Sequence, residues 1–330
     1  MQAQAQSASG HATAASESPY LITKTDVNKF KDAGYHTVES VLYTVKKNLL
    51  LIKGITEAKI DKVLEAIQKE KSFSFKTGVE ALHLRKRIKK ITTGTSMGLD
   101  ALLGGGLESS SITEIYGEFR TGKTQWVHTL AVTAMLPAQH GGGEGKVAII
   151  DTEGAFRPEK IAPIAERFGV DCESVLNNLL IARAYNTDHQ MNMIRDLAAI
   201  MMEEGPFAIL IIDSMTSLFR VDYVGRGELS ARQQSLGQML SKITKMAEEF
   251  NVAVLITNQV MSNPDGGMTF VSDPKKPVGG HVLAHASTTR LELKKGRGDC
   301  RICKVVDSPS QPEAEASYQI SDAGIIDPKD

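Results

Sequence analysis

Residues 117–124 read Gly-Glu-Phe-Arg-Thr-Gly-Lys-Thr, and this octapeptide matches the pattern G-x-x-x-x-G-K-[ST] in full. A strand-like run, residues 112–116 (ITEIY), precedes it, and a helical stretch follows it to about residue 135. In such a setting the glycines let backbone N–H groups surround phosphate oxygens, and the positive end of the helix dipole adds to their attraction. The pattern therefore predicts a nucleotide-binding loop, with Lys123 at the β- and γ-phosphates and the Thr124 hydroxyl as a ligand of Mg²⁺.

From residue 91 onward, short apolar runs alternate with helical stretches. The apolar runs are residues 112–116, 147–150, 179–182, 209–212 and 252–257, and the helical stretches are about 124–135, 158–167, 188–203 and 230–250. Several runs are apolar on both faces, as the buried strands of a parallel sheet are. After Ser287 the helical stretches end, and strands are expected at about 289–294 and 301–306. We therefore predict an α/β fold with a mainly parallel sheet and an antiparallel C-terminal extension.

Polar residues follow three of these runs, at the edge where parallel α/β sheets bind ligands. Asp213 fits an aspartate that holds Mg²⁺ through water, although the same pattern is typical of a buried strand followed by a capping Asp. Glu153 is the best-placed base for an attacking water, while Asp151 or Glu153 could instead cap the next helix. Asn258 and Gln259 stand where an amide can sense a γ-phosphate and pass its presence to the segment that follows.

Two glycine-bearing segments follow the last two of these strands, at about residues 219–234 and 260–276. The first carries aromatic residues and three evenly spaced arginines, Arg220, Arg226 and Arg232. Mobile loops with arginines for phosphates and apolar tips that separate bases are what a nucleotide-gated polymer binder requires. A pair of ordinary surface loops remains the alternative on composition alone.

The composition limits the classes of protein to be considered. The chain has 330 residues, of which 42% are hydrophobic, so it has enough apolar surface for a large core. Its 38 basic and 39 acidic residues give a net charge of −1, which excludes a histone-like polycation and leaves only local basic patches. The sequence contains no run of about 18 consecutive apolar residues, so it predicts no membrane span. Cys300 and Cys303 lie three apart on an expected strand and so face opposite ways, which favours two ordinary thiols.

We expect four parts along the chain: a disordered tail at 1–19, a small helical domain at 20–72, a linker at 73–90 and the α/β core at 91–330. The tail contains Ala, Ser and Gln without periodicity and cannot bury enough surface to offset its ordering entropy. The linker contains five basic residues close together, and a solvated face is the default interpretation of such a charge run.

The small helical domain contains a candidate helix-hairpin-helix at residues 50–67. Gly54 would supply a tight turn with exposed backbone N–H groups that can meet a phosphate, with Lys53 and Lys59 beside it. An ordinary helical bundle with a glycine C-cap explains the same residues equally well.

From residue 21 to its end the chain resembles the eukaryotic RecA-type strand-exchange recombinases. The segments that carry the resemblance are ITTGTSMGLDALLGGGLE (91–108), GEFRTGKTQ (117–125), DTEGAFRP (151–158), GRGELSARQQ (225–234), DPKKPVGGHVLAHASTTR (273–290) and KGRGDCRICKVVDSP (295–309). The resemblance implies a RecA-like P-loop ATPase core and a nuclear protein that uses ATP and Mg²⁺. It further implies helical filaments on single-stranded DNA, exchange with double-stranded DNA, rings as a possible resting oligomer, and mediator and accessory proteins as partners.

The resemblance also implies roles for individual residues. The catalytic residues would be Lys123, the base Glu153 and the γ-phosphate sensor Gln259, and the metal ligands Thr124 and Asp213. Nucleotide contacts would come from Gly117, Glu118, Phe119, Arg120, Thr121, Gly122, Lys123, Thr124 and Gln125, and from Asp273 and Pro277 of a cap laid over ATP by the neighbouring protomer. DNA contacts would come from Arg220, Arg226, Arg232, Gln234, Pro264, Lys294 and Lys304, with Arg120 on the duplex-holding surface. Phe75 and Gly78 would lie at the protomer interface, and His285 would link nucleotide and loop states.

Branch-specific positions favour the meiosis-specific recombinases. Gln234 and Pro264 stand where the general, mitotic branch usually has Met and Val, and His281 in GGHVLAH also looks meiotic. The segments DTEG and YNTDHQ look like the general branch, which is therefore the alternative.

The chain departs from the family pattern at two positions. The protomer-linking motif Phe-x-x-Ala here ends in Gly78, which removes about 1 kcal/mol of methyl burial in the receiving pocket and predicts weaker but intact linkage. Ala155 stands where Thr is usual, beside the predicted base, and we expect it to alter the ATPase rate slightly.

Two other classes share such a core. A hexameric ring helicase would need a motor arrangement and usually a different appended domain. A non-catalytic accessory paralogue would not need the intact set of Lys123, Thr124, Glu153 and Asp213.

Overall fold

The computed structural model describes residues 22–70, 75–262 and 275–328. The chain divides into two compact units, residues 1–75 and 76–330. The predicted tail at 1–19, together with Pro264 and Asp273, lies outside the described residues. Among the helices that the structure describes, none has the length and apolar character needed to cross a membrane.

The first unit is a small helical bundle. Its described elements are α1 (Lys24–Asp32), α2 (Val38–Leu42), α3 (Lys46–Leu49) and α4 (Glu57–Glu70). Thr23 and Thr37 begin the first two helices with reciprocal capping boxes, which satisfy backbone N–H groups that a helix start otherwise leaves unpaired. Its core consists of eight buried apolar residues, namely Phe30, Val41, Leu49, Ile52, Ile55, Ile60, Val63 and Ile67.

The turn of the candidate helix-hairpin-helix lies between α3 and α4. Gly54 has a φ of +76°, a backbone conformation that favours glycine, and its carbonyl accepts a hydrogen bond from Lys29 Nζ at 3.0 Å. Lys59 Nζ contacts the buried Asp26 carboxylate at 2.8 Å and so holds α4 to α1. Of the two lysines predicted beside this turn, Lys59 therefore has a structural partner, whereas Lys53 is exposed.

The second unit is an α/β domain with one large sheet. Its helices are α5 (Gly78–Arg85), α6 (Leu99–Leu102), α7 (Lys123–Thr133), α8 (Ile161–Phe168), α9 (Cys172–Asn177), α10 (Thr187–Glu204), α11 (Ser217–Asp222), α12 (Leu229–Phe250) and α13 (Gly280–Ala286). Its strands are β1 (Lys90–Ile91), β2 (Leu107–Glu108), β3 (Ser111–Gly117), β4 (Lys146–Asp151), β5 (Leu179–Arg183), β6 (Phe207–Asp213), β7 (Ala253–Ser262), β8 (Lys275–Pro277), β9 (Thr289–Lys295), β10 (Cys300–Asp307), β11 (Glu315–Ser321) and β12 (Gly324–Ile326).

The strand order within the large sheet is β12-β11-β10-β9-β3-β7-β6-β4-β5, and β8 pairs with the end of β7. The pairs among β9, β3, β7, β6, β4 and β5 are parallel, whereas the pairs from β9 to β12 are antiparallel. This confirms the predicted mainly parallel sheet with an antiparallel C-terminal extension. The expected strands and longer helices are all present, and most of their ends agree with the prediction within a few residues. The exception is β7, which continues to Ser262 and pairs there with β8, so both described ends of the predicted second loop are strands.

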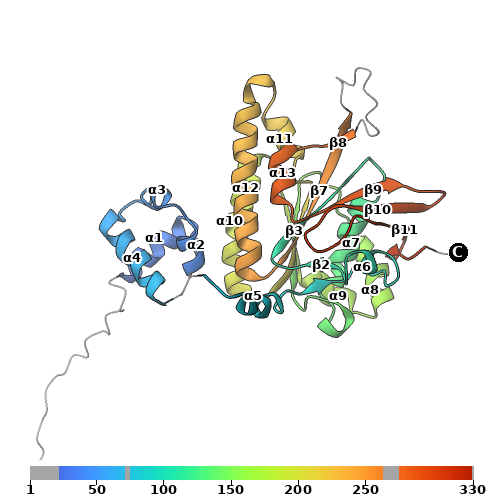
Figure 1. Cartoon of the computed structure of the whole chain (residues 1–330), viewed down its shortest axis with the longest axis horizontal. Coiled ribbons are helices and arrows are strands. Elements are labelled where there is room, and N and C mark those ends of the chain that lie inside the picture. The colour runs from blue at the N-terminus through green and yellow to red at the C-terminus, as the bar shows by residue number, and fades with distance from the viewer. Residues whose placement is uncertain (1–21, 71–74, 263–274, 329–330) are drawn as a thin grey trace, which may run out of the picture. The chain divides into compact units, whose positions relative to one another are not determined.

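Helices cover both faces of the parallel part of the sheet (Figure 1). Ile209 and Ile211 belong to the core with α7, α8 and α9, whereas Leu210 and Ile212 belong to the core with α10 and α12. Successive residues of one strand point to opposite faces, so a strand between two helical layers must be apolar throughout. This requirement explains the uninterrupted apolar run before Asp213. Because the paired strands are parallel, their carboxyl ends and the polar residues there lie at one edge of the sheet.

Candidate nucleotide site

The loop of residues 117–124 connects β3 to α7, as predicted. Gly122 has a φ of +102°, and a Cβ on it would lie 2.8 Å from the Ile320 side chain. A Cβ on Gly117 would lie 2.3 Å from the Leu293 carbonyl oxygen. The backbone contact at Gly117 and the positive φ at Gly122 both disfavour a larger residue, so the loop's path requires both glycines.

The amine of Lys123 lies inside this loop. Its Nζ donates hydrogen bonds to the carbonyl oxygens of Gly117 at 2.8 Å and Glu118 at 2.9 Å. Burial lowers the pKa of Lys123 from its ordinary value, while the nearby Asp213 and Glu153 carboxylates oppose that shift. The amine is therefore held at the N-terminus of α7, where the helix dipole also favours an anionic ligand.

The rest of the loop is more open. Arg120 has a φ of +65°, and its guanidinium lies 5.3 Å from the ring centroid of the exposed Phe119. The Thr121 hydroxyl closes the loop on the Glu118 carbonyl at 2.8 Å. Gln125 lies in the first turn of α7, and its backbone N–H donates a hydrogen bond to the Gly122 carbonyl at 2.9 Å.

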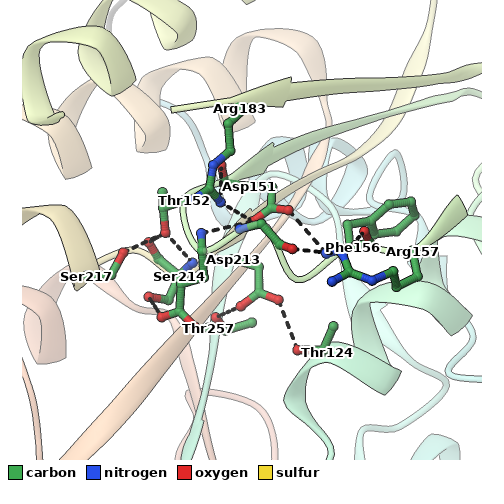
Figure 2. Close-up of polar contacts among 12 residues, drawn as sticks. Thr124, Asp151, Thr152, Phe156, Arg157, Arg183, Asp213, Ser214, Ser217 and Thr257 are labelled. Atoms are coloured by element: carbon green, nitrogen blue, oxygen red, sulfur yellow. Dashed lines mark hydrogen bonds and ion pairs between the residues drawn. The ribbon is translucent and has the colours of Figure 1, made fainter. Parts of the chain in front are cut away.

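Asp213 and Thr124 face each other across the site (Figure 2). Asp213 Oδ2 accepts a hydrogen bond from Thr124 Oγ1 at 3.2 Å, and Oδ1 accepts one from Thr257 Oγ1 at 2.5 Å. Burial raises the pKa of Asp213, and the Thr257 hydrogen bond opposes that shift. A carboxylate and a hydroxyl are hard oxygen donors, so this pair fits Mg²⁺. The helix that follows β6, α11, begins without a side-chain cap bond, and the metal role of Asp213 stays a prediction.

Glu153 lies close to the predicted sensor. Its Oε1 accepts hydrogen bonds from Ser214 Oγ at 2.9 Å and from Gln259 Nε2 at 2.9 Å. These two bonds, from Ser214 just after β6 and from Gln259 within β7, hold one oxygen of the carboxylate. Glu153 is exposed, so water can reach its carboxylate.

Asp151 contacts its own loop and Arg183, as Figure 2 shows for Phe156 and Arg183. Its carboxylate accepts the backbone N–H groups of Glu153 at 2.9 Å, Gly154 at 2.6 Å and Phe156 at 3.1 Å. Arg183 Nη1 adds an ion pair at 3.1 Å. Asp151 therefore folds the loop that carries Glu153. The alternative that either carboxylate caps the following helix is wrong, because that helix begins without a side-chain cap bond.

The side-chain amides of Asn258 and Gln259, which are neighbours within β7, differ in burial and in hydrogen-bond partners. Gln259 reaches Glu153, whereas Asn258 is fully buried and bonded to other parts of the core. Of these two side chains, only that of Gln259 is partly exposed. The hydroxyls of Thr257 and Ser214, which contact Asp213 and Glu153, were not expected from the sequence. The signal that could have indicated them is their place next to polar residues at strand ends.

The first glycine-bearing segment is largely helical, which corrects the expectation of a loop. Arg220 lies in α11, Arg226 in a short 3₁₀ helix, and Arg232 and Gln234 in the first turns of α12. Burial of apolar side chains stabilises α11 in this segment despite its glycines, and Phe219, for example, is only 1% exposed in the core. Arg220 Nη1 lies 3.4 Å from Gln259 Oε1 and so reaches the nucleotide site from this segment.

The remaining predicted residues lie on other elements. Lys294 and Lys304 are on β9 and β10, and their amines pair with Glu292 at 2.9 Å and Glu313 at 2.5 Å. His285 is on α13, where its ring lies 6.0 Å from that of His281, one helical turn away. Pro277 ends β8.

The predicted linking residues are accessible. The side chain of Phe75 is fully exposed at the end of the first unit. Gly78 is the first residue of α5 in the second unit.

Comparison with known proteins identifies the family. The chain is similar to a meiotic recombination protein DMC1 homolog of Arabidopsis thaliana, with 60% identity over 92% of this chain and 88% of the relative. It is 59% identical to the corresponding protein of Glycine max, again over 92% and 88% of the two chains. A DNA repair protein RAD51 of Mycosarcoma maydis is 54% identical over 94% of this chain and 91% of that protein. The Rad51 family model matches residues 84–328, nearly the whole second unit, and with these relatives it shows that the chain belongs to the Rad51 family.

Proposed function

We propose that this chain is an ATP-dependent DNA recombinase that forms helical filaments on single-stranded DNA and exchanges strands with double-stranded DNA in meiosis. One observation carries the proposal: Gln259 contacts the base Glu153 with its amide N–H and the arginine of the first DNA segment, Arg220, with its carbonyl. The nucleotide site and a predicted DNA-binding segment therefore share one side chain. The meiotic assignment is supported by the higher identity to proteins named for meiotic recombination, 60% against 54% for the RAD51 relative.

The geometry suggests how the chain would use ATP. The loop N–H groups and Lys123 would bind the phosphates in place of the Gly117 and Glu118 carbonyls that the amine now contacts. Thr124 and Asp213 would hold Mg²⁺, which supplies charge neutralisation on the phosphates. Glu153 would orient the attacking water and accept its proton, while Ser214 and Gln259 hold the carboxylate in place.

The DNA-binding surface would be formed by the segments at 219–234 and 260–276. Arg220, Arg226 and Arg232 would contact phosphates of the first strand, and Arg120, Lys294 and Lys304 would hold the second, duplex partner. Release of Lys294 and Lys304 from their glutamate partners would accompany that contact. Asp273 and Pro277 would cap the nucleotide of a neighbouring protomer, and His285 would respond to that contact.

The same proposal covers assembly and location. Phe75 would insert into the next protomer, with rings as a possible resting form. The protein would act on chromosomal DNA in the nucleus, together with mediator and accessory proteins. The helical first unit would contribute to DNA or partner binding.

Electron microscopy with Mg²⁺, a non-hydrolysable ATP analogue and single-stranded DNA tests this function. We expect helical filaments from the wild-type chain and none from Lys123→Ala, which removes the buried amine. Lys160→Ala is the matched control, because its exposed ion pair with Asp322 contributes little to stability. Normal assembly of Lys123→Ala would refute the site assignment, and closed rings around DNA would indicate a helicase. Absence of DNA-stimulated ATP hydrolysis would indicate an accessory paralogue.

A further inference from the structure

The Asn258 side chain uses all its principal hydrogen-bonding directions although it is fully buried. Its Oδ1 accepts hydrogen bonds from Thr216 Oγ1 and from the backbone N–H of Gln259, both at 2.8 Å. Its Nδ2 donates to Glu114 Oε1 at 2.8 Å and to the Val278 carbonyl at 2.7 Å. One amide therefore joins four places in the chain.

Three of these places belong to functional segments. Thr216 immediately precedes α11, which carries Arg220. Gln259 is the proposed phosphate sensor. Val278 lies between β8 and α13, and its own N–H donates to the Gln259 carbonyl at 2.9 Å. Asn258 thus binds the start of the first DNA segment, the sensor and the chain that returns from the second DNA segment.

The fourth partner fixes which way the amide points. Glu114 on β3 is 0% exposed, and its Oε2 accepts a hydrogen bond from Arg290 Nε at 2.7 Å. An ionised carboxylate only accepts hydrogen bonds, so it requires the NH₂ group of Asn258 on its side. The oxygen of the amide must then face Thr216 and Gln259, which both donate.

Burying polar and charged groups costs desolvation free energy, so we infer that this network does more than fill the core. A buried carboxylate, guanidinium and amide are stabilising only when every partner is satisfied, and apolar residues of equal volume would serve packing as well or better. The network lies beneath the nucleotide site, and its ends are at the roots of both DNA segments.

We propose that Asn258, oriented by Glu114, is a positioning residue that keeps the sensor Gln259 and the roots of both DNA segments in one fixed arrangement. The proposal rests on the proposed function, since it assigns a role toward ATP-controlled DNA binding. It concerns residues that do not themselves touch nucleotide or DNA.

Thr216→Val tests the connection to the first DNA segment. Valine keeps the volume of threonine and removes only the hydroxyl that donates to Asn258. Thr133→Val is the matched control, because Thr133 is equally buried and its hydroxyl donates to the Thr92 carbonyl at 2.7 Å, outside the network. The affinity of each full-length protein for a fluorescent single-stranded oligonucleotide is measured with the ATP analogue and with ADP. We expect both variants to lose similar thermal stability and only Thr216→Val to lose preference for the ATP analogue, by about fivefold, as one buried hydrogen bond implies.

Glu114→Gln tests the orientation of the amide without any nucleotide. A glutamine presents an NH₂ group to one of two donors, so either the Asn258 or the Arg290 bond is lost. Hydrogen exchange in the nucleotide-free protein should become faster at the amides of Gln259 and Val278 and stay unchanged between β4 and β5.

The outcomes separate the two proposals. Wild-type preference in Thr216→Val, or unchanged exchange at Gln259 and Val278 in Glu114→Gln, overturns the positioning role. If the wild-type protein binds DNA equally with either nucleotide, the proposed function fails, and the exchange measurement still decides whether Glu114 and Asn258 position Gln259.

Discussion

Gly78→Ala is expected to strengthen the linkage between protomers. Gly78 is the first residue of α5, where the Thr77 side chain caps the helix. A Cβ built on Gly78 meets no atom of the chain within 4 Å, so the substitution introduces no clash. The added methyl is therefore free to be buried by a neighbouring protomer that receives Phe75.

The size of the effect follows from the buried methyl. Burial of one methyl group contributes about 0.8 kcal/mol. At about 1.4 kcal/mol for each factor of ten, this corresponds to about a fourfold stronger contact. With one such contact in each link of the proposed filament, we expect the concentration at which filaments form to fall by about the same factor.

Sedimentation with Mg²⁺, the ATP analogue and single-stranded DNA measures that concentration. Phe75→Ala supplies the control, because the methyl has a pocket only when the phenylalanine anchor is docked. The double variant should show no gain over Phe75→Ala alone. An unchanged threshold in Gly78→Ala, or an equal gain in both backgrounds, would refute the assignment of residues 75–78 as the linking motif.

Two further predictions concern stability. Tyr318 is fully buried, and its hydroxyl donates a hydrogen bond to the Thr121 carbonyl in the phosphate-binding loop at 2.8 Å. Tyr318→Phe should therefore lower the free energy of unfolding by about 1–2 kcal/mol in chemical denaturation and weaken ATP binding in a nucleotide titration. Undiminished ATP affinity would mean that the hydroxyl does not position the loop. The Lys59 and Thr23 hydrogen bonds lower the pKa of the buried Asp26 well below its ordinary value. The carboxylate should therefore stabilise the first unit fully above about pH 4 and progressively less as the pH falls toward its folded-state pKa, and hydrogen exchange in α1 and α4 should show this dependence in the wild type but not in Asp26→Asn.

Much of the second unit could be predicted because its strands are buried on both faces. The run before Asp213 is apolar at every position because helices cover both sides of β6, and its short length and three isoleucines favour a buried strand over a helix. The first DNA segment could not be predicted in the same way. Its glycines and arginines resemble a loop, yet tertiary contacts of Phe219 place residues 217–222 in a helix.

Polar residues near strand ends could be noticed in the sequence, but which of them would pair could not be predicted, because the partners are distant in sequence. Ser214 contacts Glu153 across 61 positions, and Asn258 contacts Glu114 across 144. Their meeting depends on strand register, which local sequence patterns do not contain.

Sheet register explains both what was predicted and what was not. Asp151 is paired with Asp213 in one row across β4 and β6, whereas the last pair of β3 and β7, Gly117 and Gln259, lies two residues beyond that row because Ile212 is paired with Ile256. Apolar runs locate such a row within one or two residues. That interval is also the separation between Asp151 and Glu153, whose roles differ. A carboxylate within the row folds back on its own loop, whereas one two residues beyond it faces the sensor, because only the latter has left the sheet. The end of strand pairing therefore decides which carboxylate folds its own loop, as Asp151 does, and which one faces the predicted sensor, as Glu153 does.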